Sequence, residues 1–359
     1  MKAWQLERLG GMLSLVDRPI PQPRTGGVVV RIDASSLMSY MKDYVDGKLP
    51  IYHVPERPFI PGGNGVGYVH AVGPGVWHLK PGQRVVLSSH FVAQENIQDP
   101  AEILIGVTAN GADAHRMQAD WPDGTLAEYA LFPASAVTPA DDLPQLNAVQ
   151  LAMTMRCIVP FGGLLRGRLM AGETLVISGA TGAYGTAAVM VALAMGAARV
   201  VAVGRNAAAL QALGELAPGR VKTVAATGDS TTDTDAIRAA CGSRAHLAFD
   251  MVGNASDPNM TLCALRSLMK GGRLVLMGSM TVPLPVPYTE LMLNGWEILG
   301  QFMYPRDAYR RLLDLLRSGL LDMNLLRSRV YPLSALPEAM AVAAHASNFE
   351  CVVIDHHEE

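Results

Sequence analysis

Charged residues are scarce in this chain of 359 residues, since Asp, Glu, Lys and Arg make up only 17% of it. A typical globular domain has about a quarter. The net charge is −3 and no run of Lys or Arg stands out, so binding to nucleic acid is not expected. With 50% apolar residues and little charge to cover the surface of a monomer, we expect an apolar subunit interface.

Paired cysteines and an apolar amino terminus are also missing. The first ten residues, MKAWQLERLG, lack the apolar stretch of a signal peptide. The longest charge-free run, 174–198, is long enough to span a membrane, but it holds four glycines and reads as a strand, a turn and a helix. No Cys-x-x-Cys pair occurs, which argues against a disulfide framework or a cysteine zinc cluster. We therefore expect a cytoplasmic protein without membrane association; its cysteines are Cys157, Cys241, Cys263 and Cys351.

The pattern along the chain changes near residue 143, and the length suggests two domains at roughly 100 to 200 residues each. Residues 1–140 hold short β-rich runs between Pro and Gly, at 28–32, 67–72, 84–87 and 127–132. Valine-rich runs then alternate with helical stretches, which predicts an α/β fold with a doubly wound parallel sheet. Its strands are predicted at 174–178, 199–203, 221–224, 247–249 and 273–277.

A glycine-rich turn lies between the first of these strands and the next helix. Gly179, Gly182 and Gly185 have the spacing G-x-x-G-x-x-G. Such glycines allow a tight turn, close approach of a pyrophosphate and close helix packing, while the helix start offers N–H groups and a positive dipole end. The motif predicts a dinucleotide site, the alternative being a purely structural turn.

The end of the next predicted strand bears on the choice between NAD and NADP. An NAD site carries an acidic residue about twenty residues after the glycines, where it binds the ribose 2′-hydroxyl. Here the strand ends in Gly204, Arg205 and Asn206. Arg205 can bind a 2′-phosphate, and no carboxylate stands there to repel it. We predict NADP(H); the alternative is that Arg205 is a solvated residue at a helix start.

With these motifs in place, the chain resembles the medium-chain dehydrogenase/reductase superfamily, which holds zinc alcohol dehydrogenases and zinc-free quinone and enoyl reductases. The resemblance covers nearly the whole length. It implies a GroES-like β-rich catalytic domain, residues 1–150 with 305–359, and a Rossmann NADP(H)-binding domain, residues 151–304, with the active site between them. It rests on PGGNGVGYV (61–69), KPGQRVV (80–86), GTLAEY (124–129), the glycine turn, FDMVG (249–253) and GGRL (271–274).

Most zinc ligands of the superfamily are replaced in this chain. The first ligand position falls on Met38, the His-Glu pair reads Gly63-Asn64, and the last falls on Cys157. A catalytic zinc needs about three protein donors and thioethers bind it poorly. No cysteine occurs in 88–124, where members with a structural zinc carry four. We therefore expect no metal.

Without zinc, hydrogen-bond donors have to stabilise the oxyanion or enolate that develops during hydride transfer. By the resemblance, Tyr40 lies near a proton-relay position, Asn64 can donate its amide N–H, and His90 follows a strand where members place substrate residues. Each has a structural alternative: a packed aromatic ring, a left-handed residue between glycines, and a structural histidine. Cys157 is expected near the nicotinamide as a buried, inert thiol.

The resemblance also implies how the cofactor is bound. Phosphate contacts are expected from the turn and the helix start, with Tyr184 alternatively packing on the adenine side. Backbone near the ribose or carboxamide is expected from Val252, Met277 and Met303. The run 296–303 is where members join their sheets edge to edge, so we expect a homodimer. The complete predicted cofactor set is Gly179, Thr181, Gly182, Ala183, Tyr184, Gly185, Gly204, Arg205, Asn206, Val252, Met277 and Met303.

The leading functional prediction is a zinc-independent, NADPH-dependent reductase of an apolar conjugated carbonyl, a quinone or an enone. An NADP-dependent ketone or aldehyde reductase that uses Tyr40 as proton donor is the first alternative. A non-catalytic NADPH-binding protein is the second, because fold does not fix function. The expected substrate pocket is rich in methionine and aromatic residues: Met38, Tyr40, Tyr44, Phe91, Met303 and Tyr304.

Overall fold

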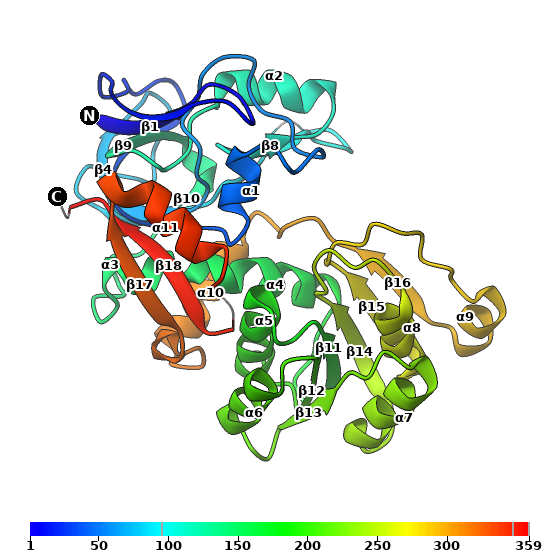
Figure 1. Ribbon diagram of the computed structural model, residues 1–359. Helices are drawn as coiled ribbons and strands as arrows, with labels where there is room; N and C mark the ends of the chain where they lie inside the picture. Colours follow the sequence, from blue (N-terminus) through cyan, green and yellow to red (C-terminus); the bar gives the residue numbers. More distant parts are fainter. Residues whose placement is uncertain (95, 347, 358–359) are drawn as a thin grey trace. The chain divides into compact units, whose positions relative to one another are not determined.

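The computed structural model describes residues 1–94, 96–346 and 348–357. The chain folds into two compact units (Figure 1). Unit 1 comprises Met1–Met155, Met323–Ala346 and the residues from Glu350 on. Unit 2 comprises Arg156–Asp322 with Asn348 and Phe349.

Unit 1 is built on a seven-stranded sheet in the order β10-β5-β4-β3-β18-β17, with β9 also paired to β3. All of its pairs are antiparallel except β17 with β18. β18 pairs with β3, so the last strand of the chain lies in the β-rich unit. The strands are β3 (Gly27–Ser36), β4 (Gly65–Val72), β5 (Arg84–Leu87), β9 (Tyr129–Pro133), β10 (Val137–Pro139), β17 (Arg327–Pro332) and β18 (Glu350–Asp355).

Two small sheets and several short helices complete unit 1. β3 is buried along nearly its whole length because it lies in the middle of the main sheet, which explains its continuous valine-rich sequence. The small sheets are β1 (Lys2–Leu6) with β2 (Leu13–Asp17), and β6 (His90–Val92) with β7 (Glu102–Leu104) and β8 (Thr108–Ala109). The helices are α1 (Met41–Val45), α2 (Ala112–Asp120), α3 (Ala148–Ala152) and α11 (Leu336–Ala343).

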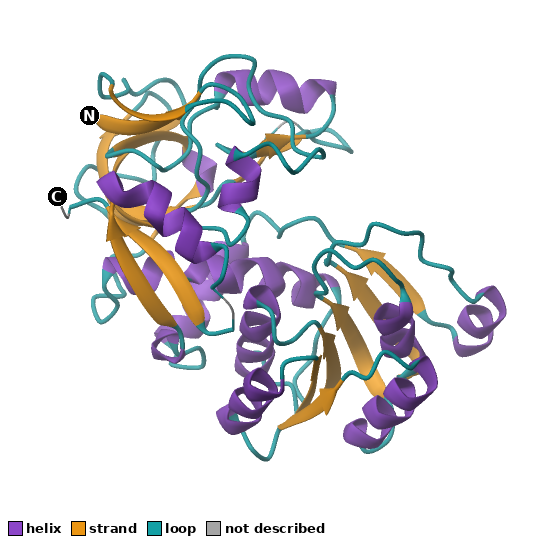
Figure 2. Ribbon diagram, viewed as in Figure 1, coloured by secondary structure: helices purple, strands orange, loops and turns teal. Residues whose placement is uncertain are grey.

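Unit 2 contains a six-stranded, all-parallel sheet in the order β13-β12-β11-β14-β15-β16. Helices flank its strands on both sides (Figure 2), so the predicted doubly wound fold is confirmed. The strands are β11 (Thr174–Ser178), β12 (Arg199–Gly204), β13 (Val221–Ala225), β14 (Ala245–Asp250), β15 (Leu268–Leu276) and β16 (Glu297–Gly300). The helices are α4 (Thr154–Arg166), α5 (Ala183–Ala194), α6 (Ala207–Leu216), α7 (Ser230–Cys241), α8 (Asn259–Arg266), α9 (Tyr288–Asn294) and α10 (Ala308–Arg317).

The observed division differs from the predicted boundaries at 304/305, because unit 2 continues to Asp322 and includes α10. Aromatic packing explains this. The rings of Tyr304 and Tyr309 meet edge to face at 5.8 Å, and the guanidinium of Arg311 in α10 lies 5.9 Å from the ring of Phe161 in α4. The first amphipathic helix of the tail therefore belongs with α4 and not with the β-rich unit.

One helical stretch among the described residues, Ala148–Arg166, has the length and hydropathy of a membrane span. It is 72% buried inside the protein, as a core helix is. The charge-free run 174–198 forms β11 and α5, as the sequence predicts.

A buried histidine joins the end of the chain to the central strand of unit 1. The hydroxyl of Ser35 in β3 lies 2.8 Å from Nε2 of His356, just after β18. Burial lowers the pKa of His356 to about 3, because the protonated ring loses its hydration. His356 is therefore neutral in the folded protein over the whole physiological range.

We expect unit 1 to lose stability as the pH falls from about 6.5 towards 3. In that window the unfolded chain protonates His356 and the folded chain does not, a difference of about 2 kcal/mol at pH 5. His356→Gln should remove this loss, measured as urea unfolding at pH 7.5 and pH 5, while the exposed His78→Gln should keep it. Equal losses in wild type and His356→Gln would contradict the assignment.

Candidate functional site

A cavity of about 800 Å³ opens at the carboxyl ends of the parallel strands of unit 2. The sheet runs from β11 to β12 in one direction and to β14 in the other, and such a switch point is where doubly wound folds bind ligands. The lining comes from the end of β12, the loops after four strands, α7 and the start of α8: Gly179, Thr181, Gly182, Val203, Gly204, Arg205, Asn206, Ala226, Thr227, Gly228, Asp233, Met251, Val252, Gly253, Asn254, Ala255, Ser256, Asp257, Asn259, Met260 and Thr261.

Two of the three glycines in the turn are required by the fold. Gly179 has a φ of +73°, and a Cβ there would lie 2.8 Å from the backbone of Met251. A Cβ on Gly185 would lie only 2.0 Å from the carbonyl oxygen of Gly179, so α5 can cross β11 this closely only with glycine. By contrast, a Cβ on Gly182 would meet nothing nearer than 3.4 Å. The space beside Gly182 is open to a ligand.

The start of α5 is arranged to receive an anion. Its N-cap is Gly182, which has no side chain to accept from the N–H groups of the first turn, and Ala183 is the first helical residue. Those N–H groups have no partner within the helix, and the dipole makes this end positive. Gly182 and Thr181 both line the cavity. The local geometry thus fits a diphosphate at this place.

The end of β12 holds the residues predicted to select the cofactor. Arg205 is exposed and lines the cavity. Asn206 caps α6, where its side-chain oxygen accepts from the N–H of Ala209 at 3.0 Å. Gly204 lies tightly against Thr181, which a Cβ would meet at 2.5 Å. Arg205 therefore places a positive charge at the cavity where β12 ends. Asn206 has a structural role, because it caps α6.

The part of the cavity that follows β13 was not predicted from the sequence. The carboxylate of Asp233 is buried in α7 and accepts from the N–H and hydroxyl of Thr227, both at 2.8 Å, and from the N–H of Gly228 at 3.0 Å. All three residues line the cavity. Their place was foreseeable, because residues after β13 must reach the same edge as those after β12.

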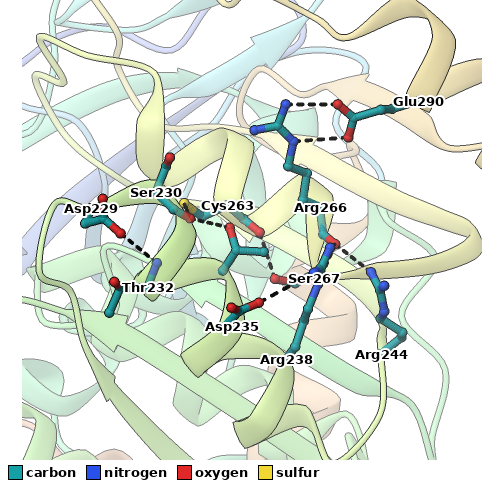
Figure 3. Close-up of polar contacts among 11 residues, drawn as sticks. Asp229, Ser230, Thr232, Asp235, Arg238, Arg244, Cys263, Arg266, Ser267 and Glu290 are labelled. Atoms are coloured by element: carbon teal, nitrogen blue, oxygen red, sulfur yellow. Dashed lines mark hydrogen bonds and ion pairs between the residues drawn. The ribbon is translucent and has the colours of Figure 1, made fainter.

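Hydrogen bonds and ion pairs connect α7 and α8 to each other and to neighbouring segments (Figure 3). Asp229 caps α7 by accepting from the N–H of Thr232 at 2.8 Å, and the thiol of Cys263 in α8 donates to the carbonyl of Ser230 at 3.4 Å. At the other end of α8, Arg238 and Arg244 donate to the carbonyl of Arg266, whose own side chain pairs with Glu290.

Five predicted cofactor residues lie outside the cavity lining: Ala183, Tyr184, Gly185, Met277 and Met303. Met277 and Met303 face α4: a Cβ on Gly163 would meet the sulfur of Met277 at 2.9 Å, and one on Gly162 the carbonyl of Met303 at 2.3 Å. Tyr184 lies under the guanidinium of Arg156, 5.8 Å from it. Val252, in contrast, does line the cavity, and its N–H donates to Asp250 at 3.1 Å.

In unit 1, Asn64 is buried and held by Ser89. The N–H of Ser89 donates to Oδ1 of Asn64 at 3.3 Å and its hydroxyl at 2.8 Å. These donors fix the amide with its oxygen towards Ser89. The alternative of a left-handed Asn64 was wrong, because the described non-glycine residues with positive φ are Arg168, Asn254, Met303 and Asn348.

The other predicted catalytic residues also have partners. His90 is buried and its Nε2 lies 2.8 Å from Glu102 on the neighbouring strand, which supports the structural alternative. Tyr40 hydrogen-bonds to Tyr52 and stacks obliquely on it at 6.1 Å. Burial raises the pKa of Tyr52, and the bond to Tyr40 opposes that rise. Cys157 is fully buried in α4, as predicted.

The expected aromatic pocket is only partly assembled. Tyr44 packs edge to face on Tyr52 at 5.4 Å and donates to the carbonyl of Val107 at 2.7 Å, so Tyr40, Tyr44 and Tyr52 form one cluster in unit 1. Phe91 instead packs on Trp121 at 6.0 Å and lines a different cavity of unit 1, of about 1020 Å³. The prediction that Phe91 shares a pocket with Tyr40 finds no support in this placement.

The donors at the superfamily's zinc positions do not fit Zn²⁺. Met38 offers a thioether, the oxygen of Asn64 already accepts two hydrogen bonds from Ser89, and Cys157 alone has a suitable atom. Among residues 1–94, 96–346 and 348–357, no three His, Cys, Asp or Glu side chains are grouped so as to hold a metal.

Comparisons with known proteins decide the family. The chain matches the family described as "Alcohol dehydrogenase GroES-like domain" over residues 24–142 and "Zinc-binding dehydrogenase" over residues 183–318. It is 30% identical over 320 residues to an alcohol dehydrogenase of Moraxella sp., covering 89% of each chain. The chain belongs to the medium-chain dehydrogenase/reductase superfamily. Another superfamily relative is the geraniol dehydrogenase of Castellaniella defragrans, 29% identical over 357 residues, with 93% of this chain and 92% of the relative covered.

Solved structures of the superfamily share the fold. A protein of Sinorhizobium meliloti 1021 described as a zinc-binding dehydrogenase bound to NADP gives a TM-score of 0.79 at 20% identity, covering 99% and 98% of the two chains. An alcohol dehydrogenase from Pyrobaculum aerophilum gives 0.76 at 21% identity, covering 99% of each. As a member of this superfamily, the protein is an alcohol-dehydrogenase-like oxidoreductase, and the superfamily implies a nicotinamide cofactor.

Two glycine substitutions should separate folding from cofactor binding. We expect Gly185→Ala to destabilise unit 2 by about 2 to 3 kcal/mol, because its Cβ overlaps a backbone carbonyl. Gly182→Ala should cost at most about 1 kcal/mol as a changed N-cap, yet weaken NADPH binding about tenfold or more by blocking the phosphate. Thermal unfolding and fluorescence titration with NADPH measure the two effects; unchanged binding in Gly182→Ala would contradict the phosphate site.

Proposed function

We propose that the protein is a cytoplasmic, NADPH-dependent reductase that works without zinc and reduces an apolar conjugated carbonyl compound. The observation that carries the choice of cofactor is the end of β12, where the exposed Arg205 lines the cavity beside Gly204. A guanidinium there can bind a 2′-phosphate through paired hydrogen bonds. The buried carboxylate of Asp233, which also lines the cavity, accepts hydrogen bonds from Thr227 and Gly228.

The residues at the zinc positions favour a conjugated acceptor. When bound, NADPH supplies a hydride. Addition of the hydride to the β-carbon of an enone leaves an enolate, whose charge is delocalised and needs less stabilisation than the alkoxide formed from an isolated ketone. A proton from solvent or a side chain at the α-carbon completes the reduction. Hydrogen-bond donors can stabilise such a delocalised charge without a metal ion.

Reduction of a ketone or aldehyde is the second candidate, and the Tyr40–Tyr52 pair favours it. A hydrogen bond between the two phenols allows Tyr40 to donate a proton to an alkoxide and to recover one through Tyr52. The relatives named alcohol and geraniol dehydrogenases support this chemistry. A protein that binds NADPH without turnover is the third candidate.

Turnover by the EDTA-treated protein tests the proposal. We expect oxidation of NADPH, and much slower oxidation of NADH, with a quinone or an enone from a panel that also holds an aldehyde and a ketone. Arg205→Met should raise the KM for NADPH about 10- to 100-fold and leave that for NADH unchanged, because a charged hydrogen bond to the 2′-phosphate is lost.

Tyr40→Phe separates the enzyme candidates. It should lower kcat about 100-fold for a carbonyl reductase that takes its proton from Tyr40, and hardly change an enone reductase. Activity that returns only with added Zn²⁺ would overturn the zinc-free mechanism. Binding of NADPH without turnover of any acceptor would leave the non-catalytic candidate.

We also propose a homodimer formed along β16. Within the described chain this strand pairs only with β15, so its other edge is open, and open edges invite pairing. Large apolar side chains nearby are exposed, including Tyr288, Met292, Leu293 and Phe302. Sedimentation velocity should give the mass of two chains, and Ile298→Pro, which removes an N–H from the open edge of β16, should shift it to one. A monomeric wild type would contradict the proposal.

A further inference from the structure

Arg156 is a cation buried at the start of α4. It is the third residue of α4 and only 1% exposed. Its side chain is the largest of the fully buried ones among the described residues. Its Nε, Nη1 and Nη2 have no hydrogen-bond acceptor in the part of the chain that the structure describes. A guanidinium carries five donors and is always charged, so burying it unpaired is among the costliest arrangements a protein can hold.

Other buried or half-buried arginines of unit 2 do have acceptors. Arg273 pairs with the carboxylate of Glu173 at 2.5 Å. Arg220 donates to the carbonyls of Ala197 and Leu193, at 2.6 and 2.9 Å. Arg156 therefore departs from the rule that this same unit follows elsewhere, and an unsatisfied buried group calls for an explanation.

The position of Arg156 supplies that explanation. Its Cζ lies 5.8 Å from the centre of the Tyr184 ring, and Tyr184 is the second residue of α5, next to the bare N-cap Gly182. A cation–π contact at this distance leaves the N–H donors unsatisfied. The guanidinium and the positive end of α5 thus lie together, and both favour a negative charge.

We infer that Arg156 is an anion-binding residue, whose guanidinium pairs with a carboxylate or phosphate group of a ligand bound beside the start of α5. Two sources have this chemistry: a phosphate of the cofactor, or a carboxylate on the acceptor that is reduced. The second source deepens the proposed function by making the substrate an anionic conjugated carbonyl. Arg156 is not among the residues that line the dinucleotide cavity, so it is a separate anchor from Arg205.

The test compares Arg156→Met and Arg156→Lys with wild type and with Arg166→Met, an exposed arginine on the same helix. Thermal unfolding is followed alone and with four probes: NADPH, reduced nicotinamide mononucleotide, trans-4-oxo-2-pentenoate and its uncharged methyl ester. The two carboxylic probes are presented with NADP⁺ already bound, so that no turnover occurs.

Without ligand, we expect Arg156→Met to melt no lower than wild type, since it removes an uncompensated buried charge. The ligand-induced rise in melting temperature should be lost, with affinity about 10- to 100-fold weaker. Arg156→Lys, which keeps the charge and loses the planar fork, should be intermediate, and Arg166→Met should behave as wild type.

The probes separate the two sources. If the anion is a cofactor phosphate, Arg156→Met weakens NADPH and reduced nicotinamide mononucleotide alike, and both support the inference. If it is an acceptor carboxylate, the variant weakens trans-4-oxo-2-pentenoate, leaves the methyl ester unchanged and leaves NADPH unchanged. Equal shifts for all four probes in wild type and Arg156→Met overturn the inference. A wild type that binds these probes through Arg156 but reduces nothing would overturn the proposed function alone.

Discussion

The buried carboxylate of Asp250 is the contact on which the edge of the sheet in unit 2 depends. It stands at the end of β14 and accepts from the hydroxyl of Ser178 at 3.0 Å, from that of Thr261 at 2.8 Å and from the N–H of Val252 at 3.1 Å. Burial raises the pKa of Asp250, and these three donors oppose the rise. Because an unsatisfied buried carboxylate is so costly, β11, β14, α8 and the loop at Val252 are held in one arrangement.

That arrangement explains why the cofactor half of the protein was predictable. The ends of β11 were given correctly at both residues, since a buried parallel strand is a continuous apolar run bounded by a glycine turn. The turn itself follows from steric limits at Gly179 and Gly185, which leave no other residue type possible. Arg205 was predicted because it stands at the end of the second strand, where an NAD site carries an acidic residue. In each case a local rule was sufficient.

The remainder depends on partners that no local rule reveals. Asp233 holds Thr227 and Gly228 through tertiary geometry, and α7 shows no motif that marks this residue. From the sequence, His90 was predicted to be a pocket residue, but in the structure its ring pairs with Glu102 on another strand. The sequence likewise hides Arg156, since nothing in its neighbours along the chain indicates that its guanidinium is buried near Tyr184. Burial and pairing over long separations are what the sequence pattern leaves out.

The pairing of β18 with β3 has a consequence for how the protein is made. Ser35 and His356 are 321 residues apart along the chain, and all of unit 2 lies between them. During synthesis, unit 2 can form its sheet from contiguous segments, but the central strand of unit 1 has to wait until nearly the whole chain has left the ribosome. Until then part of its edge stays open, in a segment rich in valine, and such edges are the sites where nascent chains aggregate. The order of the segments thus leaves this edge of β3 uncovered while unit 2 is being synthesised.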